Sequence, residues 1–111
     1  LLGAMRKKDI GTFFPDNKNK FKNIRSPKML KPIIKILYDN NFCINNLDIN
    51  LICEQPKVSK YRTKIIKSLS SLLNLDNDLI NLKGKTFEKL GLIGNEKAIA
   101  CETIISLTKY D

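Results

Sequence analysis

The chain has 111 residues, of which 42% are hydrophobic and 28% are charged. This length and composition fit one small globular domain, residues 1–111, rather than a disordered tail or a multidomain enzyme. No apolar run approaches the about 20 residues that a membrane helix needs, so no membrane partner is expected. His is absent, which removes the usual general base near neutral pH and the commonest zinc ligand. Cys43, Cys53 and Cys101 have no C-x-x-C spacing, so they predict neither a disulfide framework nor a thiolate metal site, and they favour a reducing compartment.

The formal net charge of +9 suggests a nucleic-acid partner, but the kind of basic residue argues against one. Lys supplies 17 of the 20 basic residues, and the abundance of Lys, Ile and Asn is typical of an AT-rich genome. Specific base recognition favours the bidentate guanidinium of Arg over Lys. We therefore expect no nucleic-acid partner, and a basic nucleic-acid-binding domain remains an alternative.

The first third of the chain predicts the end of a helix, a long loop and a second helix. The opening Leu1-Leu2-Gly3-Ala4-Met5 is apolar and suggests a helix whose earlier turns lie upstream. Residues 8–27 are rich in Lys and Asn and predict a long loop, which in small domains is often functional. A helix is expected over residues 27–39, with Ser26 as its N-cap and Pro27 at its first position.

The rest of the chain predicts three strands and one further helix. Residues 47–53 alternate, with apolar side chains on one face and Asp48 and Asn50 on the other, as in a half-buried strand. An apolar stripe at helical spacing predicts a helix over residues 60–74, and strands are expected at 79–85 and 99–108. This order predicts an α/β (α+β) fold in which helices cover one face of a β-sheet.

Three loop clusters remain as candidates for chemistry. The first joins Asp9-Ile10-Gly11 to Phe14-Pro15-Asp16, where an Asp in such a loop more often makes a turn than contacts a ligand. The second, residues 53–59, leaves the carboxyl end of a strand, where ligands tend to bind, although an ordinary strand-to-helix connection has the same pattern.

The third cluster, residues 83–91, holds two glycines, a hydroxyl, a carboxylate and three lysines. Thr86 could donate to a phosphate oxygen, and Glu88 could bind Mg²⁺ together with phosphate oxygens. The Walker pattern G-x-x-x-x-G-K-[ST] is not met, and taken alone this cluster is as readily a charged turn.

Together, in this order and spacing, the clusters resemble the 2-C-methyl-D-erythritol 2,4-cyclodiphosphate synthase family of the non-mevalonate isoprenoid pathway. The resemblance covers essentially the whole chain, and its single motifs are weak whereas their combination is specific. The matching residues are Leu1-Leu2-Gly3-Ala4, Asp9-Ile10-Gly11, Phe14-Pro15-Asp16, Phe21-Lys22, Ser26, Asn46-Leu47-Asp48, Pro56-Lys57, Lys83, Thr86, Glu88-Lys89-Leu90-Gly91, Gly94 and Ile99-Ala100-Cys101-Glu102.

The resemblance implies a lyase. In that family the 2-phosphate of 4-diphosphocytidyl-2-C-methyl-D-erythritol 2-phosphate attacks the β-phosphate, which releases CMP and closes a cyclic diphosphate. No protein nucleophile is needed, so catalysis is positioning and charge stabilisation. The resemblance also implies a homotrimer with mixed sheets around a threefold axis and active sites between subunits. The chain would be the C-terminal two-thirds or so of a synthase domain, located in a bacterial cytoplasm or in a plastid-type organelle such as an apicoplast or chloroplast.

The resemblance assigns roles to three sets of residues. One set would contact the erythritol side of the substrate, one would form the cytidine pocket largely through backbone groups, and one would hold the diphosphate, with Thr86 catalytic and Glu88 the ligand of Mg²⁺ or Mn²⁺. The erythritol set is Asp9, Ile10, Gly11, Phe14, Pro15, Asp16, Asn17, Lys18 and Lys22; the cytidine set is Cys53, Glu54, Gln55, Pro56, Lys57, Val58 and Ser59; the diphosphate set is Lys85, Thr86, Phe87 and Glu88.

The chain also departs from the family pattern. The family's Zn²⁺ ligands, an Asp-x-His and a later His, would lie upstream of Leu1, and this chain holds no zinc ligand of that kind. Lys18 stands where a second Asp is common, Leu92 replaces a frequent Phe, and Asn95 replaces an Arg that contacts phosphate. A non-catalytic, CDP-binding trimeric fragment is therefore the alternative to an active synthase.

Overall fold

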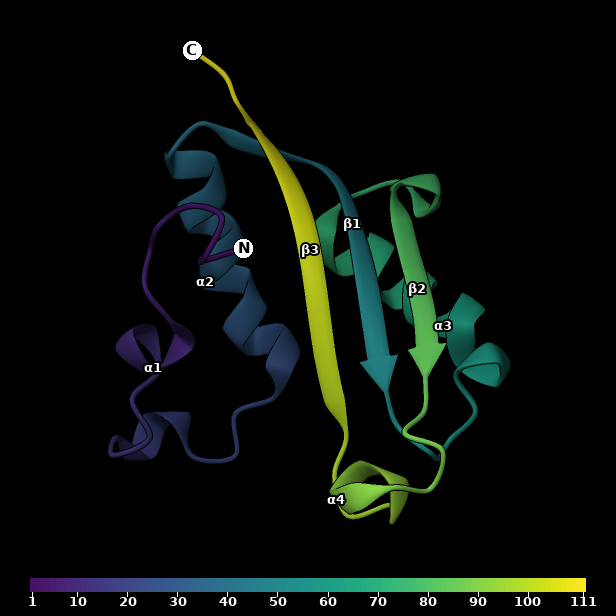
Figure 1. The fold of residues 1–111 in the computed structure, drawn as a ribbon. Coiled ribbons are helices and arrows are strands. Elements are labelled where there is room, and N and C mark those ends of the chain that lie inside the picture. Colours follow the sequence, from purple (N-terminus) through teal and green to yellow (C-terminus); the bar gives the residue numbers. More distant parts are fainter. The chain divides into compact units, whose positions relative to one another are not determined.

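The computed structural model describes residues 1–111 and divides them into two compact units. The first unit is Leu1–Asn45 with Ser106–Asp111, and the second is Asn46–Ile105. A three-stranded sheet of order β2-β1-β3 runs through the chain, and its strands are β1 (Phe42–Ile52), β2 (Ile80–Lys85) and β3 (Ala100–Lys109). β1 and β2 are parallel, whereas β3 runs in the opposite direction to β1 (Figure 1). The predicted mixed sheet with helices is therefore confirmed.

The first unit is built around α2 (Ser26–Asp39), which matches the helix predicted from the apolar spacing. Its N-cap is Arg25 rather than the predicted Ser26, because the helix takes in Ser26 ahead of Pro27. Residues 8–27 are not wholly loop, since they contain two single turns, α1 (Ile10–Phe13) and the 3-10 turn η1 (Asn19–Phe21). The buried residues of this unit form one cluster: Leu2, Met5, Ile33 and Leu37.

In the second unit, α3 (Val58–Leu73) connects β1 to β2 and packs against β2 (Figure 1). It begins two residues before the predicted start, and β2 and β3 each begin one residue later than predicted. A 3-10 turn, η2 (Asn77–Leu79), leads into β2, and the single turn α4 (Gly91–Gly94) precedes β3. The buried side chains of this unit are Leu47, Ile49, Cys53, Val58, Leu73, Ile80 and Leu82.

β1 begins at Phe42, five residues earlier than the alternation predicts. The Asn-rich stretch before residue 47 suggests a loop, but the structure uses these side chains within the sheet. Asn45 donates its Nδ2 to Ser106 Oγ at 3.1 Å and accepts from Thr108 Oγ1 at 2.8 Å. Cross-strand pairing on β3 thus overrides the weak strand propensity of Asn.

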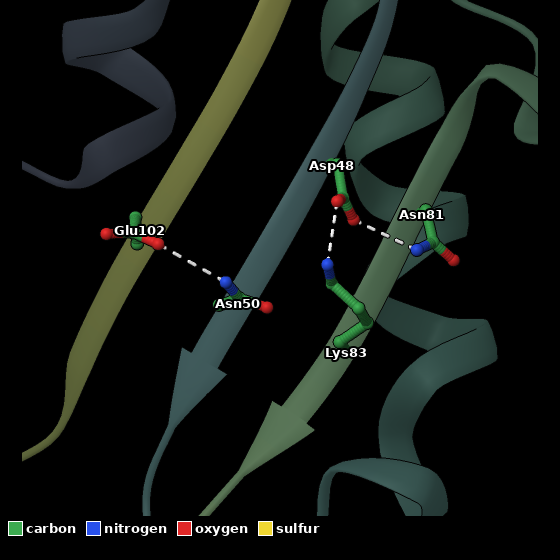
Figure 2. Close-up of polar contacts among 5 residues, drawn as sticks. All are labelled: Asp48, Asn50, Asn81, Lys83 and Glu102. Atoms are coloured by element: carbon green, nitrogen blue, oxygen red, sulfur yellow. Dashed lines mark hydrogen bonds and ion pairs between the residues drawn. The ribbon is translucent and has the colours of Figure 1, made fainter.

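Within the second unit the sheet has one apolar and one polar face, as the alternation predicts. Leu47 and Ile49 are buried, whereas Asp48 accepts hydrogen bonds from Asn81 Nδ2 at 2.9 Å and Lys83 Nζ at 2.7 Å (Figure 2). The bond from Lys83 lowers the pKa of the Asp48 carboxyl, because it favours the ionised form. These contacts fix the lateral alignment of β1 and β2 on the face opposite to the apolar one.

The same polar face continues from β1 to β3. Asn50 Nδ2 donates to Glu102 Oε1 at 3.3 Å (Figure 2), while the buried Asn50 Oδ1 has no hydrogen-bond partner.

None of the helices is both long enough and apolar enough to cross a bilayer.

Candidate functional site

The carboxyl ends of the parallel strands β1 and β2 meet at one edge of the sheet. In the register of the two strands Ile52 pairs with Lys85, and one residue further on the Cys53 backbone N–H donates to the Lys85 carbonyl at 3.0 Å. Residues 53–59 leave β1 at this edge, and Thr86 follows β2 there. The parallel pairing therefore brings together two loops that are about 30 positions apart in the sequence.

These two loops and the first turn of α3 line one cavity of about 180 Å³. Most of the residues predicted for the cytidine and diphosphate parts of the site line it, whereas Gln55, Phe87 and Glu88 do not. The lining residues are Cys53, Glu54, Pro56, Lys57, Val58, Ser59, Arg62, Gly84, Lys85 and Thr86. Residues of the second and third loop clusters thus line one cavity.

Of the lining residues, Arg62 lies outside the predicted clusters, whereas Gly84 belongs to the third cluster but received no role there. Arg62 lies one helical turn after Val58 on α3, but the helix was predicted to start at residue 60, so this neighbour relation emerges only from the structure. Its Nε donates to the Leu82 carbonyl at 3.0 Å, which anchors the guanidinium against β2. Gly84 lets β2 and α3 approach, since a Cβ at this position would lie 2.8 Å from Val58 Cβ.

The cavity has an excess of positive charge. Lys57, Arg62 and Lys85 carry cations on its wall, and Glu54 is the single carboxylate among the lining residues. Such a lining attracts an anionic ligand and disfavours a cationic one. Thr86 Oγ1 accepts from the Glu88 backbone N–H at 3.3 Å, which leaves the hydroxyl proton of Thr86 available for a phosphate oxygen.

A carboxylate from β1's loop holds the loop that follows β2. Glu54 Oε1 accepts from the backbone N–H of Phe87 at 2.8 Å and from that of Lys89 at 3.3 Å. The loop has unusual backbone angles, with φ of 53° at Glu88 and 66° at Lys89. A left-handed conformation costs a non-glycine residue about 1–2 kcal/mol, so the surroundings must impose this geometry.

A second hollow of about 360 Å³ adjoins the same loops. Gln55, which does not line the first cavity, lines this one together with Glu54, Lys57, Lys89 and Asn95. Asn95, at the position where the family resemblance places an Arg, is the C-cap of α4.

The first loop cluster belongs to the first unit and does not line the cavity of the second. Asp9 caps α1, and its Oδ1 accepts from the backbone N–H of Thr12 at 3.0 Å. In the structure the Asp9 side chain therefore stabilises a turn. Phe14 and Phe21 pack edge to face with ring centroids 5.4 Å apart. Asp9 and Ile10 line an open apolar hollow with Leu30 and Ile33.

The chain's own residues do not fit a zinc site. The chain has no His, and no group of three or more His, Cys, Asp or Glu side chains comes close enough together to hold a metal ion. Glu88, two residues after Thr86, offers a single carboxylate, so a Mg²⁺ or Mn²⁺ ion bound by it would take most of its oxygen ligands from a diphosphate and water.

Comparison with known proteins identifies what this arrangement is similar to. A relative from Pelagibacter ubique (strain HTCC1062), "Bifunctional enzyme IspD/IspF", is 50% identical over 111 residues, which is 100% of this chain and 30% of the relative. "2-C-methyl-D-erythritol 2,4-cyclodiphosphate synthase, apicoplast" from Plasmodium falciparum (isolate 3D7) is 48% identical over 101 residues, 91% of this chain and 42% of that protein.

A solved structure, "IspF (Plasmodium falciparum) CDP complex", superposes with a TM-score of 0.86 at 44% identity, covering 99% of this chain and 65% of that one. The chain thus spans about a third to two-fifths of the length of the two curated relatives. The profile of the YgbB family matches residues 1–108. The resemblance drawn from the loop motifs is confirmed, and the chain belongs to the YgbB family.

Proposed function

We propose that this chain is the nucleotide-binding part of a 2-C-methyl-D-erythritol 2,4-cyclodiphosphate synthase, a phosphorus–oxygen lyase of isoprenoid precursor biosynthesis. The observation that carries the proposal is the basic cavity between residues 53–59 and Thr86. The Plasmodium falciparum structure, 44% identical to this chain, is a CDP complex, and CDP combines a cytosine base with the diphosphate anion that such a cavity attracts.

In this proposal the two loops divide the substrate between them. Backbone groups of residues 53–59 would bind the cytosine edge, and Lys57, Arg62 and Lys85 would attract the diphosphate. Thr86 would donate to a phosphate oxygen as negative charge develops during ring closure. Because the attacking group is the substrate's own 2-phosphate, holding two phosphates in line accounts for the catalysis.

We further propose that Glu88 binds Mg²⁺ or Mn²⁺ and that the protein's Zn²⁺ site lies outside residues 1–111. A divalent cation bound at Glu88 would neutralise diphosphate charge. Asp9, Ile10 and Gly11, with the loop that holds Phe14 and Asp16, would contact the erythritol end of the substrate. Asn17, Lys18 and Lys22 belong to the same proposed set.

The functional assembly in this proposal is a homotrimer, and residues 1–111 are about two-thirds of one synthase domain. The 65% coverage of the Plasmodium structure supports the domain proposal. The trimer proposal is supported by exposed apolar side chains on and beside the outer strand β3, such as Ile104 at 71% and Ile99 at 68%. Bacterial cytoplasm or a plastid-type organelle is the proposed location.

The test is nucleotide binding and turnover by the full-length protein. Calorimetry with CDP and UDP in the presence of Mg²⁺ should show tighter binding of CDP, and ³¹P NMR should show the cyclic diphosphate forming as CMP is released. Thr86→Ala should reduce kcat by about 10²-fold or more while Thr86→Ser retains most activity. Thr63→Ala, an exposed threonine on α3, is the matched control and should match the wild-type protein.

Three results would lead to other conclusions. CDP binding without turnover in the full-length protein would favour the non-catalytic CDP-binding trimer. Equal affinity for CDP and UDP would refute the cytidine pocket. Steeply salt-dependent binding to any duplex, with no nucleotide preference, would favour the nucleic-acid alternative.

A further inference from the structure

Glu54 connects the two loops of the cavity in a way that the nucleotide proposal does not use. It follows Cys53 directly, at the point where β1 leaves the sheet, and it is half-buried. Its Oε1 accepts two backbone hydrogen bonds, from Phe87 at 2.8 Å and from Lys89 at 3.3 Å. One side-chain oxygen therefore holds both ends of the segment around Glu88.

The segment has the geometry that binds an anion through backbone N–H groups. Glu88 and Lys89 are consecutive residues in the left-handed region, with φ of 53° and 66°. Backbone N–H groups in a turn can converge on one point and form a concave anion site; here the N–H groups of Phe87 and Lys89 do so, while that of Glu88 donates to Thr86 Oγ1. In this chain the anion at that point is the Glu54 carboxylate.

Thr86 depends on the same segment. Its Oγ1 accepts from the Glu88 N–H at 3.3 Å, so the backbone that Glu54 holds also orients the Thr86 side chain. Thr86 and Glu54 both line the 180 Å³ cavity. A change in the path of residues 87–89 would therefore move the Thr86 hydroxyl, to which the proposed function assigns a phosphate oxygen.

We propose that Glu54 is a positioning residue, which fixes the segment from Thr86 to Lys89 so that the Thr86 hydroxyl and the Glu88 carboxylate meet the diphosphate. This inference rests on the proposed function for its ligand. The role is geometric, because both hydrogen bonds go to one oxygen, and a neutral amide oxygen has the two lone pairs needed to accept them.

A purely electrostatic role of Glu54 predicts the opposite effect of Glu54→Ala on the affinity for an anionic nucleotide. Glu54 is the one carboxylate among three cationic side chains on the cavity wall. If only its charge mattered, both Glu54→Gln and Glu54→Ala would strengthen the binding of an anionic nucleotide. If it positions the segment, Glu54→Gln binds as well as the wild-type protein or better, and Glu54→Ala binds more weakly.

The experiment compares the full-length wild-type protein with Glu54→Gln, Glu54→Ala and the control Asp78→Ala, an exposed carboxylate in η2. Hydrogen–deuterium exchange of the peptide spanning residues 86–90 is measured without ligand. We expect faster exchange in Glu54→Ala alone. The Kd for CDP with Mg²⁺ should rise about tenfold in Glu54→Ala, and kcat should fall more than KM changes, because the loss of two hydrogen bonds misplaces Thr86.

The two readouts separate this inference from the proposed function. If the wild-type protein binds no CDP, the proposed function fails, and the exchange data alone decide whether Glu54 holds the segment. Unchanged exchange in Glu54→Ala, or a Glu54→Gln variant that behaves like Glu54→Ala, overturns the positioning role. Should Glu54→Ala fail to fold, Glu54→Asp, whose carboxylate is one methylene shorter, replaces it and should show the same faster exchange.

Discussion

Gly84 allows the sharpest stability prediction, because the space beside it is measured in the structure. The residue lies in β2 and faces Val58, the first residue of α3. A Cβ added at Gly84 would lie 2.8 Å from Val58 Cβ and 3.0 Å from Val58 Cγ2. Carbon atoms in contact prefer about 3.5–4.0 Å, so Gly84→Ala must move the first turn of α3 away from β2.

The expected cost is the balance of two effects. Forcing a methyl group into a filled space costs about 1–3 kcal/mol. Replacing Gly by Ala in a strand by itself raises the free energy of unfolding by about 0.5–1 kcal/mol, since the unfolded chain then has less conformational freedom to lose. Gly84→Ala should therefore destabilise the protein by about 1 kcal/mol, with an upper bound of about 2.5 kcal/mol, and each kcal/mol should lower Tm by about 4–8 °C in a domain of this size.

Urea denaturation followed by circular dichroism, at a fixed protomer concentration, measures the change. Gly3→Ala is the matched control, because nothing lies within 4 Å of a Cβ at Gly3. Adding Val58→Ala to Gly84→Ala should restore only part of the stability, since residue 58 keeps its Cβ. Val58 and Gly84 also line the cavity, so the Kd for CDP should rise with Gly84→Ala. A Gly84→Ala variant as stable as Gly3→Ala would refute this reasoning.

Three further predictions concern the core, the polar face and a helix end. Leu37 is fully buried, so Leu37→Ala should cost about 2–5 kcal/mol in urea denaturation, whereas Thr63→Ala, at an exposed site on α3, should cost less than about 0.5 kcal/mol. The hydrogen bond from Lys83 holds the pKa of Asp48 below its ordinary 3.8, so the stabilisation is complete above that pH and is lost as the pH falls through the lower value of the folded protein. Asp48→Asn should accordingly flatten the loss of stability below about pH 4 in an acid titration, and an unchanged slope would contradict the assignment. Asn74 ends α3 at φ 50°, so Asn74→Ala should cost about 1 kcal/mol and Asn74→Gly should cost none, as thermal unfolding would show.

The helices were predictable because their side chains carry the periodicity themselves. α2 matches the apolar spacing that ends at Leu37, and α3 matches the stripe over residues 60–74 to within two residues. The start of β1 was not predictable from spacing, because Asn45 belongs to the strand through hydrogen bonds to β3, more than 60 residues away. A partner that distant leaves no local pattern.

In the candidate site, too, some features were predictable from the sequence and others were not. The resemblance assigned residues 53–59 and Thr86 to parts of one substrate, and the structure places both on the wall of one cavity. The hydrogen bonds from Phe87 and Lys89 to Glu54 connect residues 33 and 35 positions apart, and no spacing rule indicates them. Arg62 lies on the helix predicted over residues 60–74, but Val58 lies before its predicted start, and the bond from Arg62 to the Leu82 carbonyl depends on how α3 meets β2.

The backbone hydrogen bond from the Cys53 N–H to the Lys85 carbonyl has a consequence for the order of folding. The cavity exists only after β2 has paired beside β1, which requires closing the stretch of chain between these two residues through α3. Closing such a loop costs conformational entropy before the new contacts compensate for it. A nascent chain whose β2 has not yet been synthesised therefore lacks the nucleotide cavity. A ligand that binds this cavity stabilises only chains in which β1 and β2 are already paired.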